Sequence, residues 1–184
     1  ARKGALARRA AGAVVSYFAA HRALAIGILT TGTGDAGHTI PLGHFRLPSG
    51  PLETCEPDAC ERAVEVLISS SAPLGMQNPL DGRDIRVTPL VVRVGYRFAA
   101  EGSLDAGVDA TMLGGADRGS VEDRASEDAA LILGAVAWQP SWAGLDPHVI
   151  DVAPADDGWS IELFADRAIL SSPFTMITRA TFPG

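Results

Sequence analysis

The chain has 184 residues, with 15 Lys and Arg against 22 Asp and Glu for a net charge of −7, and 47% of its residues are hydrophobic. This composition excludes an intrinsically disordered chain, and the sequence holds no apolar stretch long enough for a membrane span. The length suits one domain with its own core, so we expect a single domain over residues 1–184. The acidic balance argues against binding nucleic acid through charge neutralisation.

The first 34 residues carry five basic side chains and no acidic one, whereas the remaining 150 carry ten basic and 22 acidic ones, or −12. An Ala- and Val-rich run over 10–20 follows this basic start, a pattern faintly like a signal peptide. The run is short, His21 and Arg22 interrupt it, and its apolar residues share one side of a helix. We therefore expect an amphipathic first helix rather than a targeting segment. The residues on its apolar side are Leu6, Ala13, Val14, Tyr17, Phe18 and Leu24.

Residues 27–58 form a loop-rich segment, because they contain six glycines and four prolines. We expect one short hairpin in it, around Thr39–Leu47. Three of its glycines match the G-x-G-x-x-G spacing of a dinucleotide-binding turn. Such a site needs a helix to begin directly after the glycines, and Pro41 and Gly43 argue against one, so we interpret the glycines as loop residues.

Two segments alternate between apolar and other residues as strands do, Ala63–Ser70 and Asp84–Phe98, with a turn-rich break over Pro73–Gly82 between them. Pro89 cannot donate a backbone hydrogen bond, so we expect a bulge or a sheet edge there. The residues expected to face the core are Val64, Val66, Ile68, Leu90, Val92, Val94, Tyr96 and Phe98.

The second half begins with a flexible insertion over residues 99–119, which holds five glycines and no periodic apolar pattern. A helix is expected over Val121–Trp138, with Ser120 as its N-cap and acidic residues in its first turns. Further strands are expected over His148–Val152, Trp159–Phe164 and Ala168–Phe182, with a tight turn at Asp156-Asp157-Gly158. This order predicts an α+β fold, a mostly antiparallel sheet meander with an N-terminal helix and a second helix packed on it.

The best candidate for metal binding is a group of four residues within 23 positions: His38, His44, Cys55 and Cys60. Their spacings, His-x5-His and Cys-x4-Cys, are loose compared with known zinc sites. We favour two free thiols, with a disulfide and a zinc site as the alternatives. No nucleophile motif or phosphate-binding loop accompanies them. We therefore predict that the protein is not an enzyme and has no catalytic, cofactor-binding or metal site, the alternative being a small metal-binding enzyme that uses these four residues.

Three arginines, Arg93, Arg97 and Arg179, should stand on strand faces that turn away from the core. One interpretation is an ordinary solvated sheet face. The other is a subunit interface in which each arginine meets a carboxylate of a neighbouring copy, since Arg makes bidentate pairs with carboxylates. We take the interface as the hypothesis to test.

The order of these elements matches that of one known family. The matching features are a helix ending near His21, the strand Ala63–Ser70, the strand end Val-Val-Arg-Val-Gly-Tyr-Arg-Phe (91–98), the acid-started helix Glu122–Trp138, the segment Ala-Asp-Asp-Gly-Trp (155–159) and the closing strand Ile169–Phe182. In this order the chain resembles the tail terminator proteins of long-tailed bacteriophages. The resemblance covers residues 5–25 and 60–184, and it departs from the family at 27–58 and 99–119, where smaller members have shorter connections.

The resemblance implies a structural virion protein that forms a ring, usually of six copies. Such a ring ends the polymerisation of the tail tube and joins the tube to the neck of the head. The implied partners are other copies of the chain, the tail-tube protein and a neck or connector protein, with DNA passing through without specific binding. No cofactor and no membrane are implied, and the expected location is the virion tail after assembly in the host cytoplasm. Another neck or tail-tube ring protein is the alternative within this class.

Overall fold

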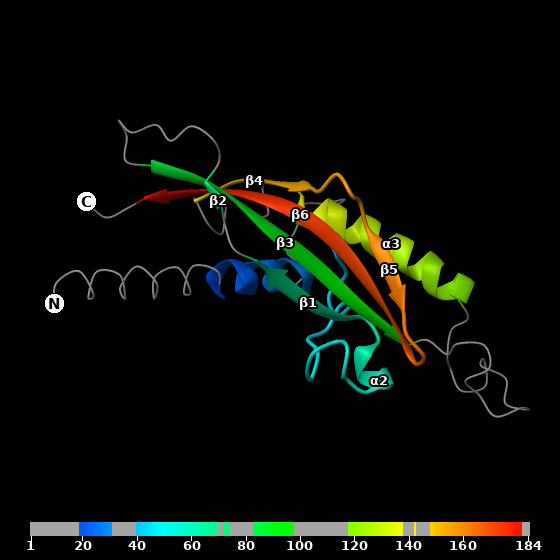
Figure 1. Ribbon diagram of the computed structural model, residues 1–184. Helices are drawn as coiled ribbons and strands as arrows, with labels where there is room; N and C mark the ends of the chain where they lie inside the picture. Colours follow the sequence, from blue (N-terminus) through cyan, green and yellow to red (C-terminus); the bar gives the residue numbers. More distant parts are fainter. Residues whose placement is uncertain are drawn as a thin grey trace, which may run out of the picture.

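The computed structural model describes residues 19–30, 40–69, 72–73, 83–97, 118–137, 142 and 148–181. They form a six-stranded antiparallel sheet with helices, which confirms the α+β fold class (Figure 1). After a helix over residues 19–30, the elements are α2 (Pro57–Cys60), β1 (Ala63–Ile68), β2 (Ala72–Pro73), β3 (Arg83–Arg97), α3 (Arg118–Val136), β4 (Val149–Pro154), β5 (Ser160–Leu163) and β6 (Arg167–Thr181). No helix in these ranges is long and apolar enough to cross a membrane.

Two long strands form the centre of the sheet. β3 and β6 pair along all 15 residues, from Arg83 opposite Thr181 to Arg97 opposite Arg167. β1 and β2 pair with the outer side of β3, and β4 and β5 pair with the outer side of β6. The last strand therefore lies between β3 and β4 rather than at an edge.

The bulge or edge expected at Pro89 is wrong, because β3 is a central strand and pairs with β6 without a shift of register. The Pro89 carbonyl accepts from the amide of Ser69 at 3.2 Å, so its nitrogen also faces the β1 side, at the break between β1 and β2. Pro173 of β6 is placed in the same way. Its carbonyl accepts from the amide of Ala155 at 3.0 Å, at the break between β4 and β5. Each proline therefore lies at a position where no flanking strand would accept a hydrogen bond from the N–H that proline lacks.

One face of the sheet packs against both helices. The strand residues expected to face the core are buried, with Ile68 half-buried and Phe98 outside the described residues. The core cluster joins them to apolar side chains of the first helix, of α3 and of β6, among them Ala25, Ile28, Ala125, Ile132, Leu170 and Phe174. The alternation in the sequence therefore identified the buried face of the sheet correctly.

The helical predictions needed correction at their ends. The first helix continues through residue 30, past Leu24, the last residue on its expected apolar side, and it buries His21 together with Ala25, Ile28 and Leu29. The apolar residues that predicted this helix, other than the half-buried Leu24, lie outside the described residues. Ser120 lies inside α3 rather than capping it, since α3 begins at Arg118. Of the expected insertion, residues 99–117 lie outside the described ranges and the last two belong to α3.

The loops show one correction and one agreement. The hairpin expected around Thr39–Leu47 is absent from the described residues 40–47, where His44 closes a turn onto the Pro41 carbonyl and Arg46 makes a single bridge to Ala63. The tight turn before β5 is confirmed, because Gly158 has φ +67° and donates to the Ala155 carbonyl at 3.2 Å. A positive φ explains the glycine at this position.

Candidate functional site

One face of the sheet packs against the first helix and α3, and the opposite face is covered at one end by residues 51–60, which we call the cap (Figure 1). The cap contains α2 and lies over the end of β3 and the start of β6. Gly95 of β3 lies directly beneath it, where an added Cβ would be 2.9 Å from the Cys60 carbonyl oxygen. The strand therefore needs glycine for the cap to approach this closely. The cap and strand residues that pack together are Leu52, Cys55, Cys60, Ala63 and Ile169.

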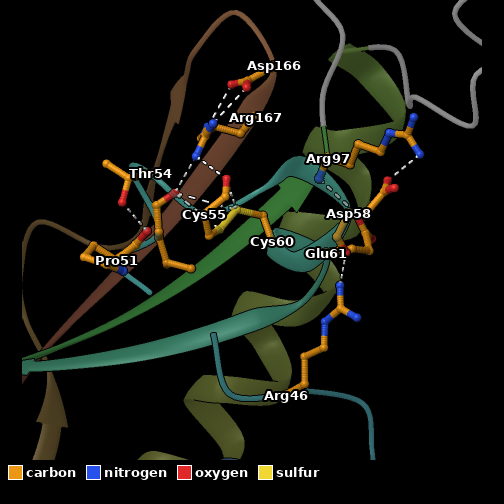
Figure 2. The surroundings of a disulfide bond; sticks show 11 residues. Arg46, Pro51, Thr54, Cys55, Asp58, Cys60, Glu61, Arg97, Asp166 and Arg167 are labelled. Atoms are coloured by element: carbon orange, nitrogen blue, oxygen red, sulfur yellow. Dashed lines mark hydrogen bonds and ion pairs between the residues drawn. A yellow bond between two sulfur atoms is a disulfide. The ribbon is translucent and has the colours of Figure 1, made fainter. Parts of the chain in front are cut away.

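Cys55 and Cys60 form a disulfide inside the cap, with their Cα atoms 6.0 Å apart (Figure 2). This corrects the preference for two free thiols. It also removes both sulfurs as metal ligands, because a metal binds the thiolate. Of the two histidines in the metal hypothesis, His44 pairs with Asp128, and His38 lies outside the described residues. Within the part of the chain that the structure describes, no group of three metal-binding side chains occurs.

Arginine side chains of the central strands β3 and β6 bind residues of the cap. Arg93 of β3 bridges Glu53 of the cap at 2.6 Å and Glu65 of β1 at 2.9 Å. Arg97 of β3 pairs with Asp58 at 2.7 Å, and Figure 2 shows the two side chains pointing toward one another. The cap is therefore fixed to the sheet by ion pairs as well as by apolar packing.

Arg167 of β6 is the most highly connected of these arginines. Its Nη1 donates to the carbonyl oxygens of Leu52 at 3.1 Å and Cys55 at 2.7 Å (Figure 2). Its Nε and Nη2 donate to the two carboxylate oxygens of Asp166 at 2.7 and 2.8 Å. These hydrogen bonds from Arg167 lower the pKa of Asp166. A backbone hydrogen bond, followed by the one from Arg93, likewise lowers the pKa of Glu53.

These contacts affect the three arginines of the interface hypothesis differently. Arg93 and Arg97 stand on the face away from the core, as expected, but acids of the same chain pair with them. Sequence analysis did not foresee this, because the partners in the cap are about 40 residues away along the chain. Arg179 is exposed on β6, and among the described residues no ion pair engages it. An interface role stays a prediction, and Arg179 is the arginine best placed for it.

A second cluster of polar side chains lies on the side of the sheet that the first helix and α3 cover. It surrounds the fully buried carboxylate of Asp128 in α3. His44 Nε2 is 2.6 Å from its Oδ1, while Arg62 Nε at 3.2 Å and the Tyr96 hydroxyl at 2.9 Å donate to its Oδ2. Burial, followed by the nearby Asp128, raises the pKa of Tyr96, so the hydroxyl stays a donor. The carboxylate joins α3 to β3, to the turn before residue 46 and to the residue before β1.

Arg62 reaches this carboxylate from a strained backbone, with φ +52° at a residue that is not glycine. Its amide donates to the Gly95 carbonyl at 2.8 Å and its carbonyl accepts from Arg46 at 3.0 Å. Sequence analysis missed this cluster. The available signal was that Asp128 occupies the same side of the helix as the buried Val121, Ala125 and Ile132.

Beyond the cap, the described strands carry mainly apolar, partly exposed side chains on the second face of the sheet, together with Arg179, which lies opposite Ile85. We call this surface the open face; its residues are Leu67 of β1, Ile85, Val87, Pro89 and Val91 of β3, and Pro173, Thr175 and Ile177 of β6. The register sets them side by side, with Leu67 opposite Val91 and Val91 opposite Pro173. Leu67 is 41% exposed and Ile85 is 38% exposed.

A scan against protein-family models finds no match, and a search of curated proteins finds no similar sequence. The resemblance to tail terminators therefore depends on the order of the elements in this chain. Two structural features remain as guides to function: the open face, whose apolar side chains are partly exposed, and the cap, which is held by ion pairs and contains a disulfide.

Proposed function

We propose that the protein is a structural subunit of a homo-oligomeric ring, of the kind that terminates a phage tail tube and joins it to the neck. The open face carries this proposal. The solvated face of an antiparallel sheet is commonly polar, and the largest exposed apolar patch of a monomer, typically a few hundred Å², is often functional. The patch covers two paired strands from Ile85 to Val91, roughly 24 by 10 Å from ordinary strand spacings, with Leu67 of β1 beside Val91.

A contact of this size supports assembly through repetition. A patch of about 240 Å² is small beside the roughly 800 Å² per partner of a standard stable interface. A head-to-tail interface repeated around a closed ring buries such a patch in every subunit, together with whatever second surface meets it. A closed ring therefore buries more surface in each subunit than an isolated pair of subunits joined through the open face alone.

The order of elements supports the terminator within this class. The first helix, the strands before α3, α3 itself and the closing strands follow one another in the order that the resemblance implies. The net charge of −7 agrees with a ring whose acidic surface would let DNA pass without binding it. The metal-enzyme alternative loses its support, because two of its four proposed ligands are joined in the disulfide.

The decisive experiment is the solution mass of the purified chain, measured by native mass spectrometry, with electron microscopy of the same sample. The proposal expects a closed ring, and it expects tail tubes grown with the protein to stop at a fixed, capped end. A neck or tube protein would give rings or stacks that leave tube length unchanged. A strictly monomeric chain that does not bind tail tubes would contradict the proposal.

A further inference from the structure

The disulfide of the cap is shielded from solvent. Cys60 is fully buried and Cys55 is 5% exposed, because Leu52, Ala63 and Ile169 pack around them. A dithiol reductant must bring a thiolate into line with the two sulfur atoms to cleave the bond. We infer that the cap is a reduction-sensitive cover, and that its lifting from β3 and β6 is the step that admits a reductant to the Cys55–Cys60 disulfide.

Three arginines of the two central strands hold the cap closed, beside a hydrogen bond from Arg46 to the Asp58 carbonyl. Arg167 donates to carbonyl oxygens at two points of the cap, Leu52 and Cys55. Arg93 and Arg97 each bind one acid of the cap. Lifting the cap breaks these contacts, so the arginines set how often the sulfur atoms are exposed.

The chemistry is that of ordinary thiol–disulfide exchange. One thiolate of the dithiol attacks one cysteine sulfur, the S–S bond breaks, and the other cysteine leaves as a thiolate. The second thiol of the reductant then attacks the mixed disulfide and releases the first cysteine. The protein gains two electrons and two protons, and the dithiol becomes a cyclic disulfide.

Reduction then changes the surface of the sheet. The disulfide closes a ring of six residues. Its loss adds conformational freedom to the lifted cap but not to the closed cap, and this favours the lifted state. The lifted cap uncovers Ala63, Gly95 and Ile169, which lie on the same face as the open face. The apolar surface available to a partner therefore grows when the disulfide is reduced. This inference stands apart from the proposed ring, since it concerns the isolated chain.

The rate of reduction by dithiothreitol tests the gating step. The native protein is mixed with the reductant, and the thiols that appear are alkylated and counted by mass spectrometry over time. Arg167→Ala removes the hydrogen bonds to both cap carbonyls, and we expect reduction about tenfold faster than in the wild type. Arg179→Ala removes an exposed arginine of the same strand outside the cap, and its rate should stay within about twofold of the wild type.

Two further measurements complete the test. Arg93→Ala should also speed reduction, and it replaces Arg167→Ala if circular dichroism shows that the latter does not fold. Amide hydrogen exchange at Cys55 and Cys60, whose N–H groups bond to the Pro51 and Glu56 carbonyls, should become faster on reduction and in the Cys55→Ser/Cys60→Ser variant. Equal reduction rates in folded variants and wild type, unchanged exchange on reduction, or two free thiols in protein purified without reductant would each overturn the inference.

Discussion

Tyr96 of β3 donates its hydroxyl to Asp128 of α3 at 2.9 Å, and both side chains are fully buried. The bond ties a central strand to the helix that covers it, from inside the core. Two further groups, on Arg62 and His44, meet the same carboxylate. A buried charge is tolerated only when such partners surround it, so the four residues should act as a unit.

Removal of one member of this unit should be costly. Tyr96→Phe deletes a hydrogen bond to a charged group, and we expect the free energy of unfolding to fall by about 1.5–3 kcal/mol. Asp128→Ala leaves buried donors without an acceptor and should cost about 3–5 kcal/mol. Urea denaturation measures both. In the Asp128→Ala background, Tyr96→Phe should cost much less than alone, and equal costs in the two backgrounds would mean that the residues are independent.

Two glycine substitutions should have opposite effects. Gly95→Ala places a Cβ 2.9 Å from the backbone oxygen of Cys60, so the cap must shift, and we expect a loss of about 1–3 kcal/mol in the free energy of unfolding. Gly134→Ala is the control, because its Cβ meets nothing within 4 Å inside α3, and it should raise stability by about 0.5–1 kcal/mol. Thermal melting compares the two, and a Gly95→Ala protein as stable as wild type would show that the cap adjusts freely.

The arginines of the second face should differ in their effect on folding. The Arg93 side chain is 13% exposed and binds two carboxylates, so Arg93→Ala should lower the free energy of unfolding by about 1–2 kcal/mol. Arg179 is exposed, and Arg179→Ala should change it by less than about 0.5 kcal/mol. Denaturation midpoints of the monomer at low protein concentration measure this difference. If the order were reversed, the ion pairs at the cap would contribute nothing to stability.

Acid should loosen the cap first. The pKa values of Glu53 and Asp166 are lowered in the folded state, so the unfolded chain binds more protons at mildly acidic pH. Their contribution to stability is present above their ordinary pKa values of 4.5 and 3.8, and it is lost as pH falls through the lower folded values. Urea midpoints between about pH 6 and pH 3 should fall less steeply in Glu53→Gln than in wild type. Identical slopes would assign the acid sensitivity to other carboxylates.

The proposed ring predicts a difference between two similarly exposed residues. Ile85 on the open face is 38% exposed and Leu133 on α3 is 44% exposed. Ile85→Asp places a charge in the expected contact and should abolish rings, whereas Leu133→Asp should leave them intact. Both variants should keep the circular dichroism spectrum of the wild type. Native mass spectrometry gives the answer, and rings that survive Ile85→Asp would show that the open face is not the interface.

The strands could be predicted from the sequence because each alternates over a half-buried surface. The core positions of β1 and β3 follow from local periodicity alone. The position of β6 between β3 and β4 could not be predicted, since it depends on contacts between distant segments. The same is true of the cap, where the spacing of Cys55 and Cys60 fits free thiols, a disulfide or a metal, and the packing under Arg167 decides among them.

The acid in the core shows a different limit. The pattern of α3 was interpreted through its apolar residues, so the single acidic residue on their side passed unnoticed. Local propensity carries no sign that Arg62, 66 residues earlier, would supply a partner from a left-handed backbone conformation. Buried charges depend on tertiary partners, and their presence in a sequence becomes interpretable only with the fold.

The placement of Pro89 and Pro173 has a consequence for how this protein tolerates change. At each proline the neighbouring chain can leave the sheet without leaving a backbone N–H of the central strand unpaired, because proline has no N–H. Residues inserted between β1 and β2, or between β4 and β5, would extend these connections without removing any hydrogen bond between β3 and β6. Loop length adds little entropy cost. The two margins of the sheet can therefore vary in length and sequence while the central pair of strands stays constant.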